Sequence, residues 1–405
     1  MQLAEFQFLL TPEGQQLLRQ TADPPITPGN HLQVASRLRQ QIAPALAQAV
    51  LETVLLRQLA LQKFSMATEM YFTRPALEQA TSETIARYRA SRFAQAGFTR
   101  LADLGCGIGA DALALAAYAR VIGIDLDPLR LAMARENVHA YSFGDRFFPV
   151  QADLSTLPAL DVQAVFFDPA RRDHRGRRLY SVALYQPPLQ VIDRWLVQAP
   201  SAAVKISPAI DYAELPADAE VEFISLGGEV KEGILWYGDL RRGAARSATL
   251  LPGGHSLSSA DFPGHDVPVT TPETYLYEPD GALIRAHLVQ HLARHLGAMQ
   301  IDPHIAYLTS ATYRPTPFAR CFTLEAWFPF QLKRLRSYLR TNHIGRVTIK
   351  KRGSPIEPDA LRQQLRLRGD QHRVLFLTHV LGQPAVLIGS EWLSDLTPPK
   401  PPTAG

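Results

Sequence analysis

The chain has 405 residues, more than one hydrophobic core usually serves, so we expect two or three domains. Its hydrophobic fraction of 46% is ordinary, and no apolar run approaches the roughly 18 residues needed to cross a bilayer. The N-terminus lacks the basic flank and cleavage site of a signal peptide, so we predict a cytoplasmic protein without a membrane partner. Cys106 and Cys321 alone provide neither a disulfide framework nor a four-ligand zinc site, so we expect reduced thiols and no metal.

Residues 1–96 are predicted to be helical. Leu, Ala and Gln dominate, apolar residues recur at three- and four-residue spacing from Leu46 to Leu59, and β-branched runs are absent. A stretch rich in Pro and Gly, residues 23–30, interrupts this pattern once. We therefore expect a helical cap or bundle at the start of the chain.

From Arg100 onward, short apolar runs alternate with helix-like segments, which is typical of a parallel sheet covered by helices on both faces. The predicted strands are residues 101–104, 121–125, 147–150, 164–167 and 202–206. A predicted β-hairpin follows at 221–226 and 233–237, with Gly227 and Gly228 in its turn. This order matches class I methyltransferases better than the symmetric dinucleotide fold, so the predicted fold class is α/β, with a Rossmann-like, seven-stranded mixed sheet.

Residues 239–272 are rich in Gly, Ser, Pro and Arg, and we predict a domain boundary or surface loops there. A mixed α/β pattern then resumes beyond Tyr275. Its predicted elements are a helix at 283–296, a strand at 321–328, a basic helix from Gln331, a strand at 346–350, a helix from Asp359 and strands at 374–378 and 385–388. We interpret them as two small domains, followed by a proline-rich tail that is predicted to be disordered.

The most informative stretch is residues 101–125, LADLGCGIGADALALAAYARVIGID. A predicted strand ends in this stretch, and a loop with Gly105, Gly107 and Gly109 leads directly into an Ala-rich helix. Glycines suit a loop where a ligand lies against the backbone, and the N–H groups at the helix start serve polar ligand atoms. Asp125 ends the second predicted strand, 20 positions after Gly105, where an acid can accept both ribose hydroxyls.

Glycine spacing alone does not separate two cofactors, because Gly105, Gly107 and Ala110 also satisfy the dinucleotide pattern G-x-G-x-x-G/A. Asp103 suits the cationic amino group of S-adenosylmethionine, whereas it would repel a pyrophosphate. Asp153, after the third strand, is placed to accept the adenine amino group. Taken singly, Asp103 could simply cap a turn and Asp153 could simply cap a helix.

Three acids at the carboxyl ends of three consecutive strands favour S-adenosylmethionine as the cofactor. The residues predicted to contact it are Asp103, Gly105, Cys106, Gly107, Gly109, Asp125, Leu126, Asp153 and Leu154.

The fourth predicted strand ends in Asp168-Pro169-Ala170-Arg171-Arg172. Methyl transfer is an in-line displacement that mainly needs an aligned nucleophile and an acceptor for its hydrogen, so Asp168, with Pro169, is the catalytic candidate. The alternative is an Asp-Pro turn that only ends the strand. Ala170 and Arg171 stand where amino-group methyltransferases carry a proline and an aromatic, which makes an exocyclic amine a less secure target. No cysteine is near Asp168 in the sequence, which disfavours a covalent cysteine mechanism.

Five arginines lie between positions 171 and 178. Of these, Arg171, Arg172 and Arg175 are predicted to hold substrate phosphates, and the alternative is a solvated loop. Lys205, at the end of the fifth strand, is a further candidate for substrate contact, although a strand-end lysine is as often simply solvated.

Basic charge is concentrated late in the chain. Residues 331–373 contain twelve Lys and Arg but three acids, a formal charge of +9, although the whole chain carries +4. Such a segment supplies the electrostatics of an RNA partner, with Tyr338, His343 and His372 as stacking surfaces. The alternative is a basic solvated face. The residues predicted to contact RNA are Lys350, Lys351 and Arg352.

With these residues in place, the chain resembles, over nearly its whole length, a bacterial family of class I methyltransferases with a C-terminal THUMP-like domain. The matching segments are residues 70–90 (MYFTRPALEQATSETIARYRA), 102–128, 168–178 (DPARRDHRGRR), 205–211 (KISPAID), 228–236 (GEVKEGILW), 277–286 (YEPDGALIRA) and 351–370. DPARR is a specific signature, whereas GCGIG is shared by very many methyltransferases. Ala209 departs from the family, in which a glycine is expected.

The resemblance implies a helical region at 1–96, a methyltransferase core at 97–272, a ferredoxin-like domain at 273–340, a THUMP-like domain at 341–395 and a disordered tail at 396–405. Because THUMP domains in other proteins accompany tRNA modification, it also implies RNA, either tRNA or rRNA, as the substrate. We assume a monomer.

Three alternatives remain open from the sequence. The first is a methyltransferase for a small molecule or protein. The second is an NAD-type oxidoreductase, suggested by Ala110 and Asp125. The third is a catalytically silent RNA-binding protein, suggested by the altered Ala170 and Arg171.

Overall fold

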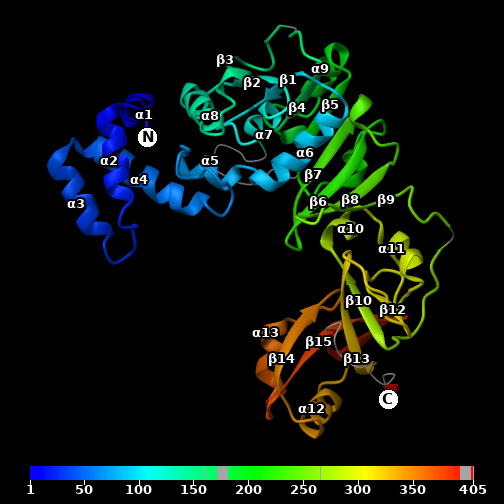
Figure 1. The fold of residues 1–405 in the computed structure, drawn as a ribbon. Helices are drawn as coiled ribbons and strands as arrows, with labels where there is room; N and C mark the ends of the chain where they lie inside the picture. The colour runs from blue at the N-terminus through cyan, green and yellow to red at the C-terminus, as the bar shows by residue number, and fades with distance from the viewer. Residues whose placement is uncertain (159, 171–180, 265, 393–402, 405) are drawn as a thin grey trace. The chain divides into compact units, whose positions relative to one another are not determined.

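The computed structural model describes residues 1–158, 160–170, 181–264, 266–392 and 403–404 (Figure 1). The chain divides into two compact units. Unit 1 consists of Met1–Glu220 and Glu232–Arg242, and unit 2 of Val221–Lys231 and Gly243–Gly405. Within the described ranges, no helix has both the length and the apolar character that crossing a membrane requires.

Residues 1–96 form helices, as their apolar periodicity predicts. The helices are α1 (Leu3–Leu9), α2 (Pro12–Ala22), α3 (His31–Gln41), α4 (Pro44–Ala60), α5 (Arg74–Gln79) and α6 (Glu83–Gln95). Helix α2 shows why they begin where they do, because the Thr11 hydroxyl accepts a hydrogen bond from the N–H of Gly14 beside a first-turn proline. Helix α4 buries Val50 and Val54 among α1, α2 and α3.

Unit 1 continues with a mixed sheet in the order β3-β2-β1-β4-β5-β7. Its strands are β1 (Arg100–Leu104), β2 (Arg120–Asp125), β3 (Phe147–Gln151), β4 (Ala164–Phe167), β5 (Ser201–Ile206) and β7 (Glu229–Tyr237). Strands β1 to β5 run parallel to one another, and residues 233–237 of β7 run antiparallel to β5. Strands β4 and β5 are buried throughout, as expected for parallel strands that helices cover. The predicted Rossmann-like mixed sheet is confirmed.

Helices connect the strands of this sheet. They are α7 (Ala112–Ala116), α8 (Pro128–Ala140) and α9 (Val191–Gln198), with 3₁₀ turns η1 (Gly144–Arg146), η2 (Val182–Leu184), η3 (Tyr212–Glu214) and η4 (Gly238–Leu240). Asp127 caps α8 by accepting hydrogen bonds from the N–H groups of Leu129 and Arg130.

The register of three strands fixes where the site lies. Leu104 of β1 pairs with Ile124 of β2 and with Phe167 of β4. The residues that follow these positions, Gly105, Asp125 and Asp168, therefore lie at the same edge of the sheet.

Unit 2 begins with three strands in the order β6-β8-β9: β6 (Glu220–Leu226), β8 (Arg246–Leu251) and β9 (His255–Ser258). The prediction of boundary loops at 239–272 is wrong for β8 and β9. The sequence of β8, RSATLL, gives a weak strand signal because small and polar residues fill half of it and glycines flank it. Pairing with β6 supplies its backbone partners and buries most of its side chains.

A second sheet follows in the order β11-β12-β10-β13-β16-β15-β14. Its strands are β10 (Tyr275–Pro279), β11 (Met299–Gln300), β12 (Leu308–Ser310), β13 (Ala319–Pro329), β14 (Ile344–Lys351), β15 (Gln371–Val380) and β16 (Gln383–Glu391). Its helices are α10 (Gly281–Arg285), α11 (Val289–Leu296), α12 (Leu332–Thr341) and α13 (Pro358–Leu365). The single helix predicted at 283–296 is instead α10 and α11, because His287 adopts φ +55° between them.

Helices α12 and α13 pack on this sheet through Leu335, Leu339, Leu361 and Leu365. The sheet takes strands from both sides of residue 340, and the predicted domain boundaries at 96, 272, 340 and 395 stay predictions. Of the tail predicted to be disordered, only Thr403–Ala404 lie in the described residues, as β17, parallel to β13.

Candidate functional site

The glycine loop lies between β1 and α7, and the space around its three glycines differs. Gly105 has φ +81°, and a Cβ there would lie 3.2 Å from the carbonyl oxygen of Asp168. Gly109 has φ +79°, and its Cβ would lie 3.1 Å from Cα of Ala134 on α8. A Cβ on Gly107, at φ +54°, would meet no described atom within 4 Å. The loop is thus packed closely at two glycines and open at the third, where a ligand can approach the backbone.

The Asp125 carboxylate is held by the loop and by the start of α8. One oxygen accepts a hydrogen bond from the N–H of Gly107 at 2.9 Å, and the other from the N–H of Asp127 at 2.9 Å. Each carboxylate oxygen can accept a second hydrogen bond. This carboxylate is therefore oriented by the backbone and retains acceptor capacity for two hydroxyls.

Asp103 on β1 is the most unusual group of the site. Its side chain is 1% exposed, and neither carboxyl oxygen has a hydrogen-bond partner among the described residues. Burial raises the pKa of Asp103 well above its usual range, the carboxylates of Asp111 and Asp168 raise it further, and the guanidinium of Arg89 opposes them. A buried acid without a partner is costly unless a ligand supplies one. The ammonium of S-adenosylmethionine fits this need.

Asp153 and its neighbours form the next part of the edge. The Asp153 carboxylate accepts hydrogen bonds from the N–H and hydroxyl of Ser155 at 2.8 and 2.7 Å, and these bonds lower its pKa. Leu154 is buried, whereas Leu126, after β2, is 64% exposed. Asp153 therefore stabilises a local turn and caps no helix of the described residues, and its predicted adenine contact stays a prediction.

Cys106, also predicted to contact the cofactor, is buried in the glycine loop. Burial and the nearby Asp103 and Asp125 raise the pKa of its thiol well above the usual range. The group is a neutral thiol at physiological pH, not a nucleophilic thiolate.

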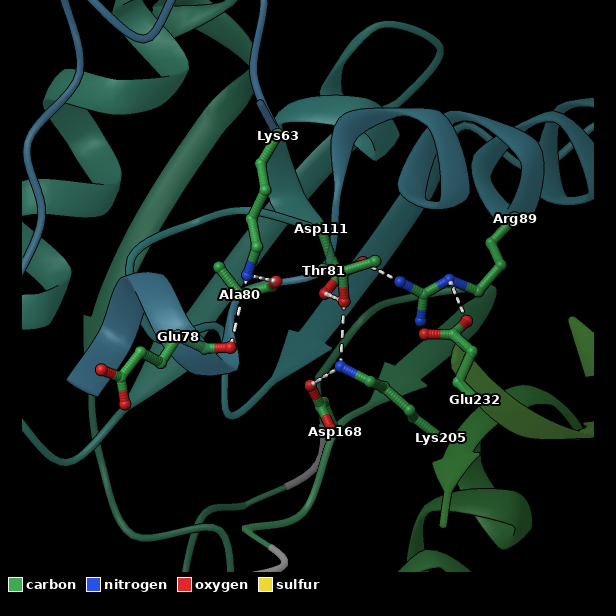
Figure 2. A network of polar contacts seen from close by, with 9 residues as sticks. All are labelled: Lys63, Glu78, Ala80, Thr81, Arg89, Asp111, Asp168, Lys205 and Glu232. Atoms are coloured by element: carbon green, nitrogen blue, oxygen red, sulfur yellow. Dashed lines mark hydrogen bonds and ion pairs between the residues drawn. The ribbon is translucent and has the colours of Figure 1, made fainter. Parts of the chain in front are cut away.

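Asp168, the catalytic candidate, follows β4 and is held by a chain of polar contacts (Figure 2). Its carboxylate lies 2.7 Å from the ammonium of Lys205, which donates a second hydrogen bond, 2.9 Å long, to the Thr81 hydroxyl. The Thr81 hydroxyl in turn donates to Asp111 at 3.3 Å. Lys205 is only 4% exposed, so the structure excludes the solvated alternative for this lysine. Pro169 is buried directly after Asp168.

Arg89 of α6 lies at the other end of this series of polar contacts, beside Asp111. Its guanidinium forms ion pairs with Asp111 and, at 3.2 Å, with Glu232 of β7 (Figure 2). It also stacks 4.5 Å from the ring centre of Phe166. Burial lowers the pKa of Arg89, but the carboxylates of Asp111 and Glu232 outweigh burial and the net shift is upward. The arginine is therefore charged although fully buried.

Hydrogen bonds from Lys63 hold the segment that leads to Thr81. Lys63 donates hydrogen bonds to the carbonyls of Leu77, Glu78 and Ala80 at 2.7, 3.3 and 3.0 Å, at the C-terminal end of α5. Figure 2 shows the contacts of Lys63 with Glu78 and Ala80 beside the polar contacts of Asp168. A cation at the carbonyl end of a helix is favourable, and here it sets the path of the chain into α6.

The sequence interpretation missed Thr81, Arg89, Asp111 and Glu232. A signal was present, because Thr81 and Arg89 fall in the family-like segment 70–90 and Glu232 in segment 228–236. Neither segment carries a ligand motif that names its chemistry. Arg171, Arg172 and Arg175, predicted to hold phosphates, lie outside the described residues.

In unit 2 the predicted RNA contacts have partners within the protein. Lys350 pairs with Glu278, and Lys351 pairs with Glu357 at 2.5 Å. Arg352 donates to the carbonyl of Ala306 at 2.9 Å. Their role in RNA binding stays a prediction.

The interleaved aromatic residues of the basic segment have neighbours as well. The Tyr338 ring packs 5.9 Å from that of Phe328, and His372 bonds the Thr348 hydroxyl at 2.9 Å. His343 is exposed, at φ +53°. Stacking of RNA bases on these rings also stays a prediction.

Comparison with known proteins agrees with this geometry. Residues 101–171 match a methyltransferase domain family, residues 319–391 a THUMP domain-like family, and residues 2–60 a domain of unknown function, DUF8688. A crystal structure from Porphyromonas gingivalis W83, provisionally named a methyltransferase, superposes with a TM-score of 0.76 at 22% identity, over 93% of this chain and 98% of that one. That likeness supports the fold.

An uncharacterized S-adenosylmethionine-dependent methyltransferase of Mycobacterium tuberculosis strain H37Rv is 36% identical over 347 residues. The match covers 82% of this chain and 92% of the relative, and a protein of the same description from strain CDC 1551 matches equally. The chain belongs to the S-adenosylmethionine-dependent methyltransferases with a C-terminal THUMP-like domain. The NAD-type oxidoreductase and the catalytically silent protein are thereby set aside.

Proposed function

We propose that the enzyme methylates RNA, and that Asp168 is the group that receives the hydrogen of the attacking nucleophile. Two features of the chain support RNA as the substrate: the match of residues 319–391 to a THUMP domain-like family, and the charge of +9 over residues 331–373. Whether the RNA is tRNA or rRNA, and a cytoplasmic location, stay predictions from the sequence.

The buried, partnerless carboxyl of Asp103 carries the assignment of the cofactor pocket. We assign Asp103 to the ammonium of S-adenosylmethionine, Asp125 to its ribose hydroxyls, and the open backbone at Gly107 to its methionine portion. When bound, the cofactor supplies an electrophilic methyl group on a sulfonium. Gly105 lets the Asp168 backbone approach the glycine loop, so the catalytic carboxylate and the cofactor pocket share one edge of the sheet.

Lys205 has a positioning role in this proposal. At 2.7 Å from Asp168 it favours the ionised carboxylate, which can accept a hydrogen bond from the nucleophile. Thr81 fixes the lysine from the opposite side, so the carboxylate is held in one orientation before the substrate arrives.

A second candidate function is methylation of a small molecule or protein. The observation that favours it is the pairing of Lys350, Lys351 and Arg352 with groups of the protein itself. Cations that already have partners release fewer counterions on binding RNA, so their contribution to RNA affinity is smaller.

The test is transfer of a labelled methyl group from S-adenosylmethionine to RNA extracted from cells that lack the gene. We expect incorporation with the wild-type protein, and a loss of about 100-fold or more with Asp168→Asn, which removes the charged acceptor. Asp145→Asn is the matched control, because Asp145 is exposed on η1 and the change is chemically the same. Nucleoside mass spectrometry then identifies the methylated base. Incorporation into protein or small molecules, but not RNA, would establish the second candidate.

A further inference from the structure

A cavity of about 650 Å³ lies wholly within unit 2. Its walls come from the turn after β6, the end of β8, the ends of β10 and β14, and the start of β13. Two of the family-like segments contribute to these walls. Segment 228–236 provides Gly228, and segment 277–286 provides the run Glu278-Pro279-Asp280-Gly281. A cavity of this volume is large enough for a ligand of nucleotide size.

The charges in the cavity are arranged in an unexpected way. Glu278 of β10 and Arg320 of β13 are direct cross-strand partners, a position in which opposite charges usually pair. Glu278 instead pairs with Lys350 and lies 4.0 Å from Arg352. Among the described residues, none forms a hydrogen bond or ion pair with the Arg320 side chain. The guanidinium therefore lines the cavity with its donors available.

The second carboxylate of the cavity does not compensate Arg320 either. One oxygen of Asp280 accepts the N–H of Ala282 at 2.8 Å and so caps α10, and the other accepts the Ser225 hydroxyl at 3.0 Å. The lining thus holds three cations, Arg320, Lys350 and Arg352, against two carboxylates that are both engaged. Such a cavity favours an anion.

Other lining groups indicate what else the anion carries. The rings of His255 and Phe318 lie 6.4 Å apart, nearly perpendicular, in the wall. Phe318 is only 9% exposed, whereas His255 is exposed, so the His255 ring offers the face on which a nucleobase can stack. Gly228, in the turn after β6, lies beside the arginine, since a Cβ there would make an ordinary 4.0 Å contact with its guanidinium. A phosphate beside Arg320 would place its nucleoside within the remaining volume.

We propose that this cavity binds a nucleotide phosphate of the RNA substrate, with Arg320 as its main ligand and Lys350 and Arg352 as flanking cations. This inference rests on RNA as the substrate class. Arg320 is the site's defining residue because its side chain has no structural partner to stabilise, whereas Lys350 and Arg352 also stabilise Glu278.

The experiment measures binding of cytidine 5′-monophosphate to the full chain by calorimetry, with S-adenosylhomocysteine present to saturate the cofactor pocket. We expect the monophosphate to bind and cytidine, which lacks the phosphate, to bind at least tenfold more weakly. Arg320→Gln should lower the affinity for the monophosphate about tenfold, the loss of one charge-assisted contact. Arg314→Gln, an equal change of charge at an exposed arginine of unit 2 outside both the cavity and the basic segment, should leave it unchanged.

Equal affinity of Arg320→Gln and wild type, or an equal loss in Arg314→Gln, would overturn the site. The source of the phosphate is tested by competition with a 5′-phosphorylated RNA hexanucleotide. Displacement of the monophosphate supports RNA, whereas binding of the monophosphate without displacement overturns the assignment to RNA and leaves a site for free nucleotides. Because no methyl transfer is measured, failure of this site is distinguishable from failure of the proposed RNA methylation.

Discussion

The sheet edge of unit 1 and the basic segment of unit 2 use charge in opposite ways. At the sheet edge, Arg89, Lys205 and Glu232 are almost fully buried and Asp111 nearly so, and each pairs with a residue that is distant in the sequence. In the basic segment, the paired side chains of Lys351 and Glu357 are 33% and 70% exposed and lie six residues apart. A buried charge that loses its partner has no water to solvate it, so buried ion pairs hold a fixed geometry. Exposed charges are solvated by water, so they can exchange one partner for another.

The largest effect is expected from a substitution that breaks the buried ion pairs of unit 1. Arg89→Met should lower the free energy of unfolding by about 3–5 kcal/mol, because Asp111 and Glu232 stay buried without their cation. Lys351→Met, which breaks the exposed pair with Glu357, should cost at most about 1 kcal/mol. Denaturant unfolding measures both. Similar losses in the two variants would show that burial does not separate the two regions.

A smaller effect, which depends on pH, is expected at Asp103. Its pKa in the folded state is raised above the unfolded value, so the folded protein binds a proton that the unfolded chain releases, and stability falls as pH rises through that window. The decline amounts to about 1.4 kcal/mol per pH unit. Asp103→Asn removes this titration, so without cofactor its melting temperature should rise relative to wild type as pH increases.

The same variant should bind S-adenosylmethionine more weakly, because the amide cannot neutralise the cofactor's ammonium. Thermal melts from pH 5 to 9, with and without cofactor, test both statements. A difference between variant and wild type that stays constant with pH would contradict the assignment of a raised pKa to Asp103.

The smallest change in stability is expected in the glycine loop. Gly107 and Gly97 both have positive φ, +54° and +77°, and a Cβ on either would meet no described atom within 4 Å. Alanine at each position should therefore cost a similar amount, about 1–2 kcal/mol. Only Gly107→Ala should also weaken S-adenosylmethionine binding, by about tenfold, since its Cβ would occupy the open side of the loop. Equal cofactor affinity of the two variants would place the ligand elsewhere.

Much of the fold could be predicted because its signals are local. Parallel strands appear here as short apolar runs, so the buried strands and the largely exposed edge strand β3 were predictable to within a residue or so at their ends. The run DLGCGIG located the loop. Strands β8 and β9 escaped prediction because pairing with other strands, rather than their own composition, makes them strands. His287 divided a helix whose apolar pattern is continuous.

By itself the sequence determined that three acids stand at the ends of three strands beside a glycine loop, since apolar runs mark where the strands end. Only the tertiary structure decided which charges meet. Arg89 is paired with Asp111 and Glu232, and Glu278 with Lys350 rather than with Arg320, its partner across the strands. The physical reason is that an ion pair depends on how side chains of distant segments pack, which no spacing along the chain encodes.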